Sequence, residues 1–449
     1  SIMKRHLAGL LALAVLFVGF SQALMAQKPW QDWSDPEFNH QSFHSKEHSA
    51  VAKERTAALQ VAIERGDRRV GQGVDNYPNH RDCFSCHHQA VPLFAMSLQS
   101  PNLGWGQGIW GDQESRRDRI VEFSKKSLER ELATLKPEEE LGGRGMTLGY
   151  ALWTMGVSRS DWGKLSDDLV SKAISTQQAD GRWRIHSVRP PAASSEFMAT
   201  ALVMFGLHHY EQQGAISNSK VSHKELAKAK YRAVLWRVSQ PEPSNTEDLC
   251  GAIWFDYLAK QTFPPAYGGL GFGAPLPGAG ATPQAVPSGL TAPASKTTDG
   301  ADSPDWNQMK EILSCLSEKK LQERRKTLLA MQNSDGGWGY EPGRQSDAYS
   351  TATSLLILAQ SDRQYKLPSV YQSLWFRYGV GYLLRTQQPD GSWHVSSVAN
   401  PVQEYFDNGD PHETDQFISM QATAWALAAL ASAYHQHAEP LSVRLPLVR

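Results

Sequence analysis

One seven-residue signature occurs three times in the chain, and this repetition limits the possible fold more than any other feature. It has the pattern Gln-x-x-Asp-Gly-x-Trp and lies at residues 177–183, 332–338 and 387–393. Each copy follows one helical pattern and precedes another. Asp-Gly is typical of a turn in which glycine supplies the positive φ that ends a helix, and the tryptophan can pack across the hairpin with its N–H group bonded. The sequence therefore predicts a repeat protein built from helical hairpins.

The periodicity of apolar residues predicts twelve helices of two alternating kinds. The first helix of each pair is amphipathic and rich in Lys, Arg and Glu, whereas the second is shorter and apolar around most of its circumference. Outer and inner rings of a closed helical barrel require this alternation, because an inner helix has neighbours on nearly every side. The predicted fold class is therefore all-α, an α/α toroid of about six hairpins. The helices are expected near residues 50–69, 87–98, 112–135, 145–157, 163–177, 195–211, 222–239, 246–260, 306–332, 347–360, 368–387 and 415–435.

Two insertions interrupt the hairpin pattern. Residues 263–305 are rich in Pro, Gly and Ala and contain too few large apolar residues to form a core, which indicates a long surface loop. Residues 400–413 precede an inner helix and are expected to form a lid-like insertion. We expect an N-terminal extension and the first outer helix within residues 27–75, and the toroid within residues 76–449.

The amino-terminal 26 residues have the pattern of a secretory signal peptide. Lys4 and Arg5 precede an apolar run at residues 7–20 and a small-residue stretch at residues 21–26. Because a membrane-spanning helix needs about 20 apolar residues, we expect cleavage and no retained membrane span. The expected location is periplasmic or secreted.

Charge and cysteine content narrow the possible partners. The formal net charge of −1 becomes −3 once Lys4 and Arg5 are removed, and no basic stripe is present, so nucleic acid is not an expected partner. In an oxidising compartment Cys250 and Cys315 are candidates for a disulfide or for two unpaired buried thiols, and the sequence leaves both alternatives open.

The segment Cys83-Phe84-Ser85-Cys86-His87 matches the attachment signature of c-type haem. Its two thiols would form thioether bonds to the haem vinyl groups, and His87 would be the axial ligand of the iron. A redox-active Cys-x-x-Cys pair, a zinc site at His87 or His88 and a short disulfide are the alternatives. The first lacks a thioredoxin-like βαβ context, and the second needs ligands from elsewhere. The predicted cofactor is therefore covalent haem c.

The haem motif lies at the start of a predicted inner helix. The amino ends of the other inner helices fall near the same mouth of the barrel, where helix dipoles favour anionic groups such as propionates. A sixth iron ligand is expected from Met146, His412 or Met420. His88 follows the proximal ligand and is expected to be a surface or propionate-contacting histidine.

The three signatures and the apolar helices that follow them resemble the QW motifs of squalene-hopene and oxidosqualene cyclases and, more distantly, the β subunits of protein prenyltransferases. The resemblance covers most of residues 140–435. It implies an α/α toroid with a central cavity whose functional groups lie where the inner helices begin. Cyclases of this family protonate their substrate with an Asp-x-Asp-Asp-Thr-Ala segment, which corresponds here to residues 347–352. Tyr349 occupies the position of the proton donor, and a phenol is too weak an acid to protonate an alkene.

The prenyltransferase likeness implies a zinc site that is incomplete here. Asp248 and Cys250 match the Asp-x-Cys pair that opens one inner helix, but Ser350 stands where the family has its histidine ligand. Zinc is therefore not an expected cofactor.

Three functions follow as hypotheses. The first is electron transfer or haem-dependent redox chemistry, with an apolar small molecule or a redox protein as partner. The second is isoprenoid cyclisation or transfer, for which the candidate catalytic residues are Asp347, Tyr349, Glu196 and Asp415. The third is a binding module without catalysis.

Overall fold

The computed structural model describes residues 46–99, 113–158, 160–186, 188–212, 221–262, 316–361, 370–371, 373–399 and 407–438. The predicted signal peptide, the loop at residues 263–305 and the first part of the insertion at residues 400–413 lie outside these ranges, as does Cys315. The described residues form twelve α-helices and, apart from two isolated β-bridges, no extended pairing. The all-α prediction is confirmed.

Every predicted helix coincides with a helix of the structure. The amphipathic set comprises α2 (Lys46–Asn76), α4 (Gln113–Thr134), α6 (Lys164–Thr176), α8 (His223–Ser239), α11 (Glu318–Ala330) and α14 (Leu374–Thr386). The apolar set comprises α3 (Val91–Ser97), α5 (Arg144–Ser158), α7 (Glu196–Gln212), α9 (Thr246–Thr262), α12 (Ala348–Ser361) and α15 (Gln416–Ala438). Among the described residues the largest difference is α2, which continues beyond the predicted end at residue 69. The predicted start of the helix at residues 306–332 lies outside the described ranges, and α11 begins at Glu318.

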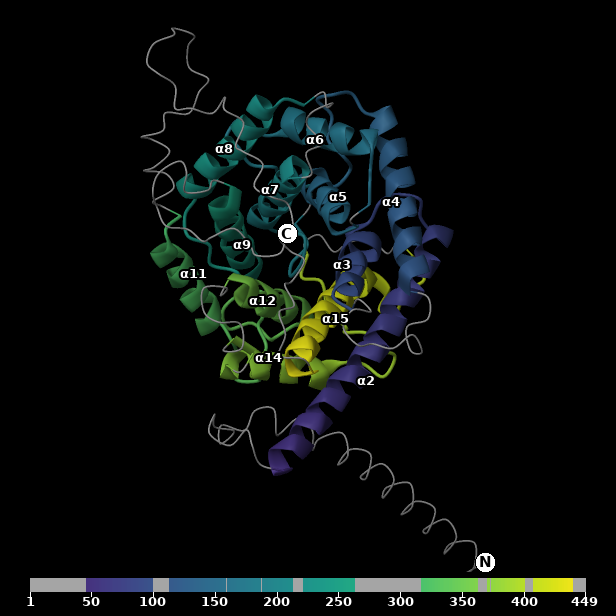
Figure 1. Ribbon diagram of the computed structural model, residues 1–449, viewed down its shortest axis with the longest axis vertical. Coiled ribbons are helices and arrows are strands. Elements are labelled where there is room, and N and C mark those ends of the chain that lie inside the picture. Colours follow the sequence, from purple (N-terminus) through teal and green to yellow (C-terminus); the bar gives the residue numbers. More distant parts are fainter. Residues whose placement is uncertain are drawn as a thin grey trace, which may run out of the picture.

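The apolar helices form the interior. All residues of α12 are buried, as are nearly all of α5. Each apolar helix contacts the next in chain order, from α3 through α5, α7, α9 and α12 to α15, and α15 contacts α3 again. In Figure 1 the amphipathic helices lie outside this series. None of the helices that the structure describes is both long and apolar enough to cross a membrane.

The three signature turns share one set of hydrogen bonds. In each turn the indole Nε1 donates to a carbonyl of the preceding amphipathic helix, and the backbone N–H of the same tryptophan donates to a threonine hydroxyl of the following apolar helix. The pairs are Trp183 with Ala173 and Thr200, Trp338 with Leu328 and Thr351, and Trp393 with Leu383 and Thr423. The tryptophans therefore fix each turn to both helices of its hairpin, as predicted.

The glutamine of each signature joins its turn to the next amphipathic helix. Gln177 Nε2 donates to the Ala229 carbonyl in α8, and Gln332 Nε2 donates to the Trp375 carbonyl in α14, each at 2.8 Å. Gln387 Nε2 donates to the Ala62 carbonyl in α2 at 2.9 Å. The last signature turn is therefore bonded to the first described helix.

Aromatic side chains fill the space where the apolar helices meet. Trp153 stacks on Trp425 with ring centroids 5.6 Å apart, and it also contacts Phe94 at 4.7 Å and Trp254 at 6.1 Å. All four side chains are at most 2% exposed. Because a water-sized space beside these rings would leave them accessible, the interior is closely packed where they meet.

Candidate functional site

The Cys-x-x-Cys-His segment begins a π-helical turn that leads into α3. This turn covers Cys86–Ala90, and its i→i+5 hydrogen bond runs from the Val91 N–H to the Cys86 carbonyl. Pro92 follows directly and has no N–H group to continue a regular helical ladder, which accounts for the wide turn. Ser85 caps the turn, because its Oγ accepts from the His88 N–H at 3.3 Å. The motif is thus held on a short, bonded element at the start of an apolar helix.

The two thiols of the motif are free and have different surroundings. Cys83 is exposed, and its Sγ lies 3.2 Å from the Tyr77 hydroxyl. Cys86 is half-buried, and its Sγ lies 3.3 Å from His87 Nδ1. Burial raises the pKa of the Cys86 thiol to about 12, against the opposing effect of Arg189. Both thiols are therefore unbonded, as haem attachment requires, and that of Cys86 lies beside His87.

His87 has the properties of an iron ligand. Its Nε2 is buried and has no hydrogen-bond partner among the described residues. The ring packs edge-on against Phe417, with centroids 4.8 Å apart. Burial, with help from the nearby His88 and Arg189, lowers the pKa of His87 well below its usual range, so the imidazole is neutral. A neutral imidazole with a free Nε2 is the form that binds a metal, and these residues therefore fit a c-type haem.

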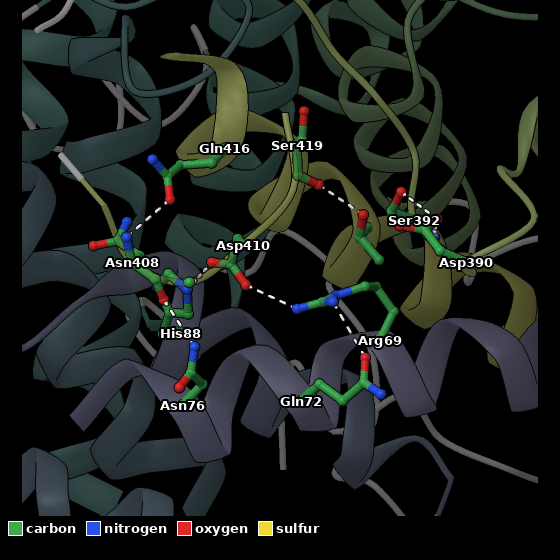
Figure 2. A network of polar contacts seen from close by, with 12 residues as sticks. Arg69, Gln72, Asn76, His88, Asp390, Ser392, Asn408, Asp410, Gln416 and Ser419 are labelled. Atoms are coloured by element: carbon green, nitrogen blue, oxygen red, sulfur yellow. Dashed lines mark hydrogen bonds and ion pairs between the residues drawn. The ribbon is translucent and has the colours of Figure 1, made fainter. Parts of the chain in front are cut away.

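Of the two expected positions of His88, at the surface or in contact with a haem propionate, the first is wrong. Its side chain is fully buried, and Nε2 lies 2.5 Å from Asp410 Oδ2. Asp410 also accepts from Arg69 of α2 at 3.0 Å, and Figure 2 shows this chain of contacts. The His88 ring stacks on Tyr77 with centroids 4.3 Å apart. Asp410 can neutralise Arg69 and hold His88 at once, so this polar network fixes the residue next to His87.

The candidate sixth ligands lie in two places, because His412 and Met420 line one small cavity and Met146 does not. Met146 is buried at the start of α5. Met420 lies in α15 beside Asp410, where its methyl group faces Gly73 of α2. His412 Nε2 is hydrogen-bonded to Ser392 Oγ at 2.9 Å, and the His412 ring stacks on that of His394. His412 is thus engaged at the third signature turn, and no contact joins His87 to any of these three side chains in the part of the chain that the structure describes.

The candidate acids occupy separate surroundings. Asp347 accepts from the N–H and Oγ of Ser350 at 2.7 and 2.8 Å, and burial raises its pKa to about 6. Glu196 pairs with Arg182 at 3.1 Å. Asp415 pairs with His394 at 2.9 Å. The first acts as a cap for α12, and the other two are each paired with a basic side chain.

Tyr349 contacts the carboxyl group of Glu247, which no sequence motif indicates. Its hydroxyl donates to Glu247 Oε1 at 3.0 Å, and Glu247 Oε2 accepts from the N–H and the Oγ of Ser194. Glu247 is 2% exposed, and desolvation raises its pKa to about 7 against the effect of these bonds. Its position in the first turn of α9 looks like an ordinary helix-start acid, so only the packing reveals that it is buried.

The Asp-x-Cys pair does not converge on a metal position. Asp248 accepts from the Asn245 side chain at 2.7 Å, whereas the Cys250 Sγ lies 3.8 Å from Ser354 Oγ. Cys250 is a free thiol. Across the described ranges, no group of three or more His, Cys, Asp or Glu side chains could hold a metal ion by itself.

Comparison with known proteins adds no relative. No family model matches the chain, and no curated protein matches it significantly.

Proposed function

We propose that this protein is an exported α/α toroid that carries one covalent haem c and serves electron transfer or redox chemistry on an apolar ligand. The toroid is supported by the closed series of contacts among the apolar helices, with the amphipathic helices outside it. The bond from Gln387 to α2 supports closure of the outer helices as well. The exported location rests on the predicted signal peptide alone.

The haem proposal depends on one observation above all, the buried and unpartnered Nε2 of His87 beside two free thiols. An unsatisfied buried nitrogen costs about 1–3 kcal/mol, and coordination of iron would satisfy the Nε2 of His87. Cys83 and Cys86 would hold the porphyrin through thioether bonds, and His87 would ligate the iron. When bound, the haem would supply reversible one-electron chemistry. The π-helical turn and the His88–Asp410 pair would keep His87 oriented.

Expression with and without c-type haem maturation enzymes tests this proposal. We expect a Soret band and a thioether-type pyridine haemochrome only with the enzymes. Replacing Cys83 and Cys86 with alanine should abolish covalent attachment, while the matched control Cys250→Ala should retain it, because that buried thiol lies in α9. Wild-type protein without bound haem under maturation conditions would refute the proposal.

Isoprenoid cyclisation or transfer is the second candidate function. It is favoured by Glu247, a buried carboxyl group with a pKa of about 7 beside Tyr349. The packed aromatic interior weighs against it, because the rings of Trp153 and Trp425 stack on each other where a long apolar substrate would have to lie. Turnover of squalene or a polyprenyl diphosphate that is lost in Asp347→Asn or Glu247→Gln would support this candidate. A protein without haem and without turnover would leave the third, a non-catalytic binding module.

A further inference from the structure

A serine and a buried carboxyl group are in direct contact where two apolar helices begin. Ser194 lies just before α7 and is half-buried, so part of its surface is open to solvent. Its Oγ donates to Glu247 Oε2, and its N–H donates to the same oxygen at 2.9 Å. Glu247 lies in the first turn of α9 and is 2% exposed. The hydroxyl proton of Ser194 is thus bonded to a buried carboxylate, which is the geometry of a nucleophile and its general base.

A third group holds the carboxyl group from its other side. The Tyr349 hydroxyl donates to Glu247 Oε1 at 3.0 Å, so each carboxylate oxygen has its own donor. The first turn of α9 is fixed as well, because the Thr246 N–H donates to the Tyr340 carbonyl at 2.9 Å and the Thr246 hydroxyl donates to the Gly339 carbonyl at 2.5 Å. A base that is oriented by a third residue is the arrangement in which serine nucleophiles are activated.

The loop before Ser194 has a conformation that an L-residue rarely adopts. Ala193 has a φ of 56°, in the left-handed region that is unfavourable for a residue with a Cβ. Ala192 is fully buried, and the Pro190 carbonyl accepts from the Val398 N–H at 2.9 Å. Such strain persists only where the surrounding structure fixes it, and it is concentrated at functional sites. Ser194 is therefore positioned by a rigid segment.

A second serine makes the same pair of bonds and shows what burial adds. Ser222 donates its N–H and its Oγ to Glu225 Oε2 at 2.9 and 2.6 Å, but both residues are exposed and form the capping box of α8. There the bonds lower the pKa of Glu225, whereas burial raises the pKa of Glu247 to about 7. A general base is most effective when its pKa lies near the working pH. The same contact is therefore a helix cap at Ser222 and a nucleophile–base pair at Ser194.

From this geometry we infer that Ser194 and Glu247 form a second catalytic site, outside the haem motif, which hydrolyses carboxylic esters with small apolar acyl groups. Tyr349 is its positioning residue. A small apolar acyl group fits because Ser194 is only half-buried and the four residues before it are prolines and alanines. The inference goes beyond the proposed function and does not depend on it.

The reaction proceeds in two balanced steps. Ser194 Oγ bonds to the ester carbonyl carbon while its proton moves to Glu247 Oε2; the bond from that carbon to the alcohol oxygen then breaks, and Glu247 gives the proton to the leaving alcohol. Water next attacks the acyl carbon, and Glu247 takes a proton from it and returns that proton to Ser194 Oγ as the acid leaves. Ester and water thus give acid and alcohol. The first N–H groups of α7 have no acceptor within the helix and favour the negative charge that develops beside Ser194.

The test treats the full mature chain with a fluorophosphonate, which phosphonylates an activated serine with loss of fluoride, and peptide mass spectrometry locates the label. We expect wild type to be labelled at Ser194 and Ser194→Ala to lose this label. In Glu247→Gln the labelling rate should fall by about 100-fold or more, the factor that a general base supplies. The matched control Ser222→Ala should keep the wild-type rate. Hydrolysis of p-nitrophenyl butyrate should follow the same order among the variants.

The pH dependence of labelling separates a base from a structural carboxyl group. In wild type the rate should rise with pH around a midpoint near 7, as Glu247 loses its proton. Tyr349→Phe removes a bond that favours the ionised carboxylate, so the midpoint should move to higher pH while the rate above the midpoint is retained. A purely structural role of Tyr349 would leave the midpoint unchanged.

The inference would be overturned if Ser194 is not labelled in wild type, if wild type does not hydrolyse the ester, or if Glu247→Gln is labelled as fast as wild type. If Glu247→Gln does not fold, the pH profile of wild type decides, and a rate that is constant between about pH 5 and 9 would overturn the inference. Because the reaction needs no haem, these outcomes leave the proposed function untouched, and the two failures are distinguishable.

Discussion

Replacing Gly391 with alanine is expected to destabilise the protein much more than the same change at Gly343. Both residues have a positive φ, 91° and 78° respectively, where an L-residue costs about 1–2 kcal/mol. Gly343 faces open space, with no atom within 4 Å of a new Cβ. Alanine at residue 343 therefore incurs the backbone cost alone, which makes Gly343→Ala the matched control.

At Gly391 the new Cβ would also collide with α2. It would lie against the carbonyl oxygen of Arg65 and 2.5 Å from the carbonyl carbon, whereas ordinary contact begins near 3.4 Å. Helix backbone cannot rotate away, so α2 must retreat by roughly 1 Å. That movement lengthens the 2.9 Å bond from Gln387 to Ala62, which contributes about 1 kcal/mol. With the backbone cost and loosened packing, the expected loss is about 3–4 kcal/mol.

Thermal unfolding followed by far-ultraviolet circular dichroism measures both variants. Unfolding entropy is about 2.1 cal/mol/K per residue, so for about 300 folded residues a loss of 3 kcal/mol corresponds to roughly 5 °C in Tm. We expect Gly343→Ala to lose at most about 3 °C. Equal losses of Tm at the two positions would show that the third signature turn does not contact α2 closely. This would refute the proposed closure of the ring of outer helices.

Two further substitutions test buried charge. Glu247 has a folded-state pKa of about 7 against about 4.5 when unfolded, so the folded state binds the extra proton and the unfolding free energy falls as pH rises from 4.5 to 7. In Glu247→Gln the fall of the unfolding free energy is expected to be smaller by about 3 kcal/mol, measured by urea unfolding at pH 5 and pH 8. An unchanged pH dependence in this variant would contradict the raised pKa of Glu247. Asp256 is fully buried between Arg237 and Arg324, at 3.0 and 2.6 Å, so Asp256→Asn should cost about 3–5 kcal/mol. Glu242→Gln should cost under about 1 kcal/mol, because that partner of Arg324 is 56% exposed, and similar losses from both changes would reject the argument.

The helices and the signature turns could be predicted because their signals are local. Apolar periodicity depends on which face of a helix is buried, and Asp-Gly-x-Trp sets the turn through φ and one indole bond. The role of Gln387 could not be predicted in the same way, since its acceptor at Ala62 lies 325 positions away. The extension of α2 to Asn76 has the same origin, because its last turns are held by tertiary contacts such as that of Arg69 with Asp410.

The same distinction between local signals and long-range contacts applies to the candidate site. Cys83, Cys86 and His87 are recognisable because the proposed haem attachment needs them at fixed spacing within five residues. His88 and Glu247 have no such spacing. Their burial depends on contacts with distant segments, so it could not be predicted from the local sequence. Pro92 was the one local sign of the π-helical turn, because it removes a donor one turn after the motif.

One face of α2 joins the third signature turn to the Cys-x-x-Cys-His segment. Ala62 accepts from Gln387, and Arg69, two helical turns further along, holds Asp410 and through it His88. A displacement of α2 at Arg65 would therefore disturb the support of His88 as well as the stability of the fold. The same kind of collision can be made elsewhere, because a Cβ at Gly181 would fall against the Arg232 carbonyl of α8, and α8 packs on α6 and α7.

Gly391→Ala and Gly181→Ala are therefore expected to lose similar unfolding free energy but to differ at the motif. In haem-free protein under native conditions, alkylation of Cys86, followed by peptide mass spectrometry, should accelerate in Gly391→Ala, because the turn that half-buries this thiol loses its support. In Gly181→Ala the rate should stay near that of wild type. Equal acceleration in both variants would mean that Cys86 becomes accessible through global unfolding, and α2 would then have no special role in holding the site.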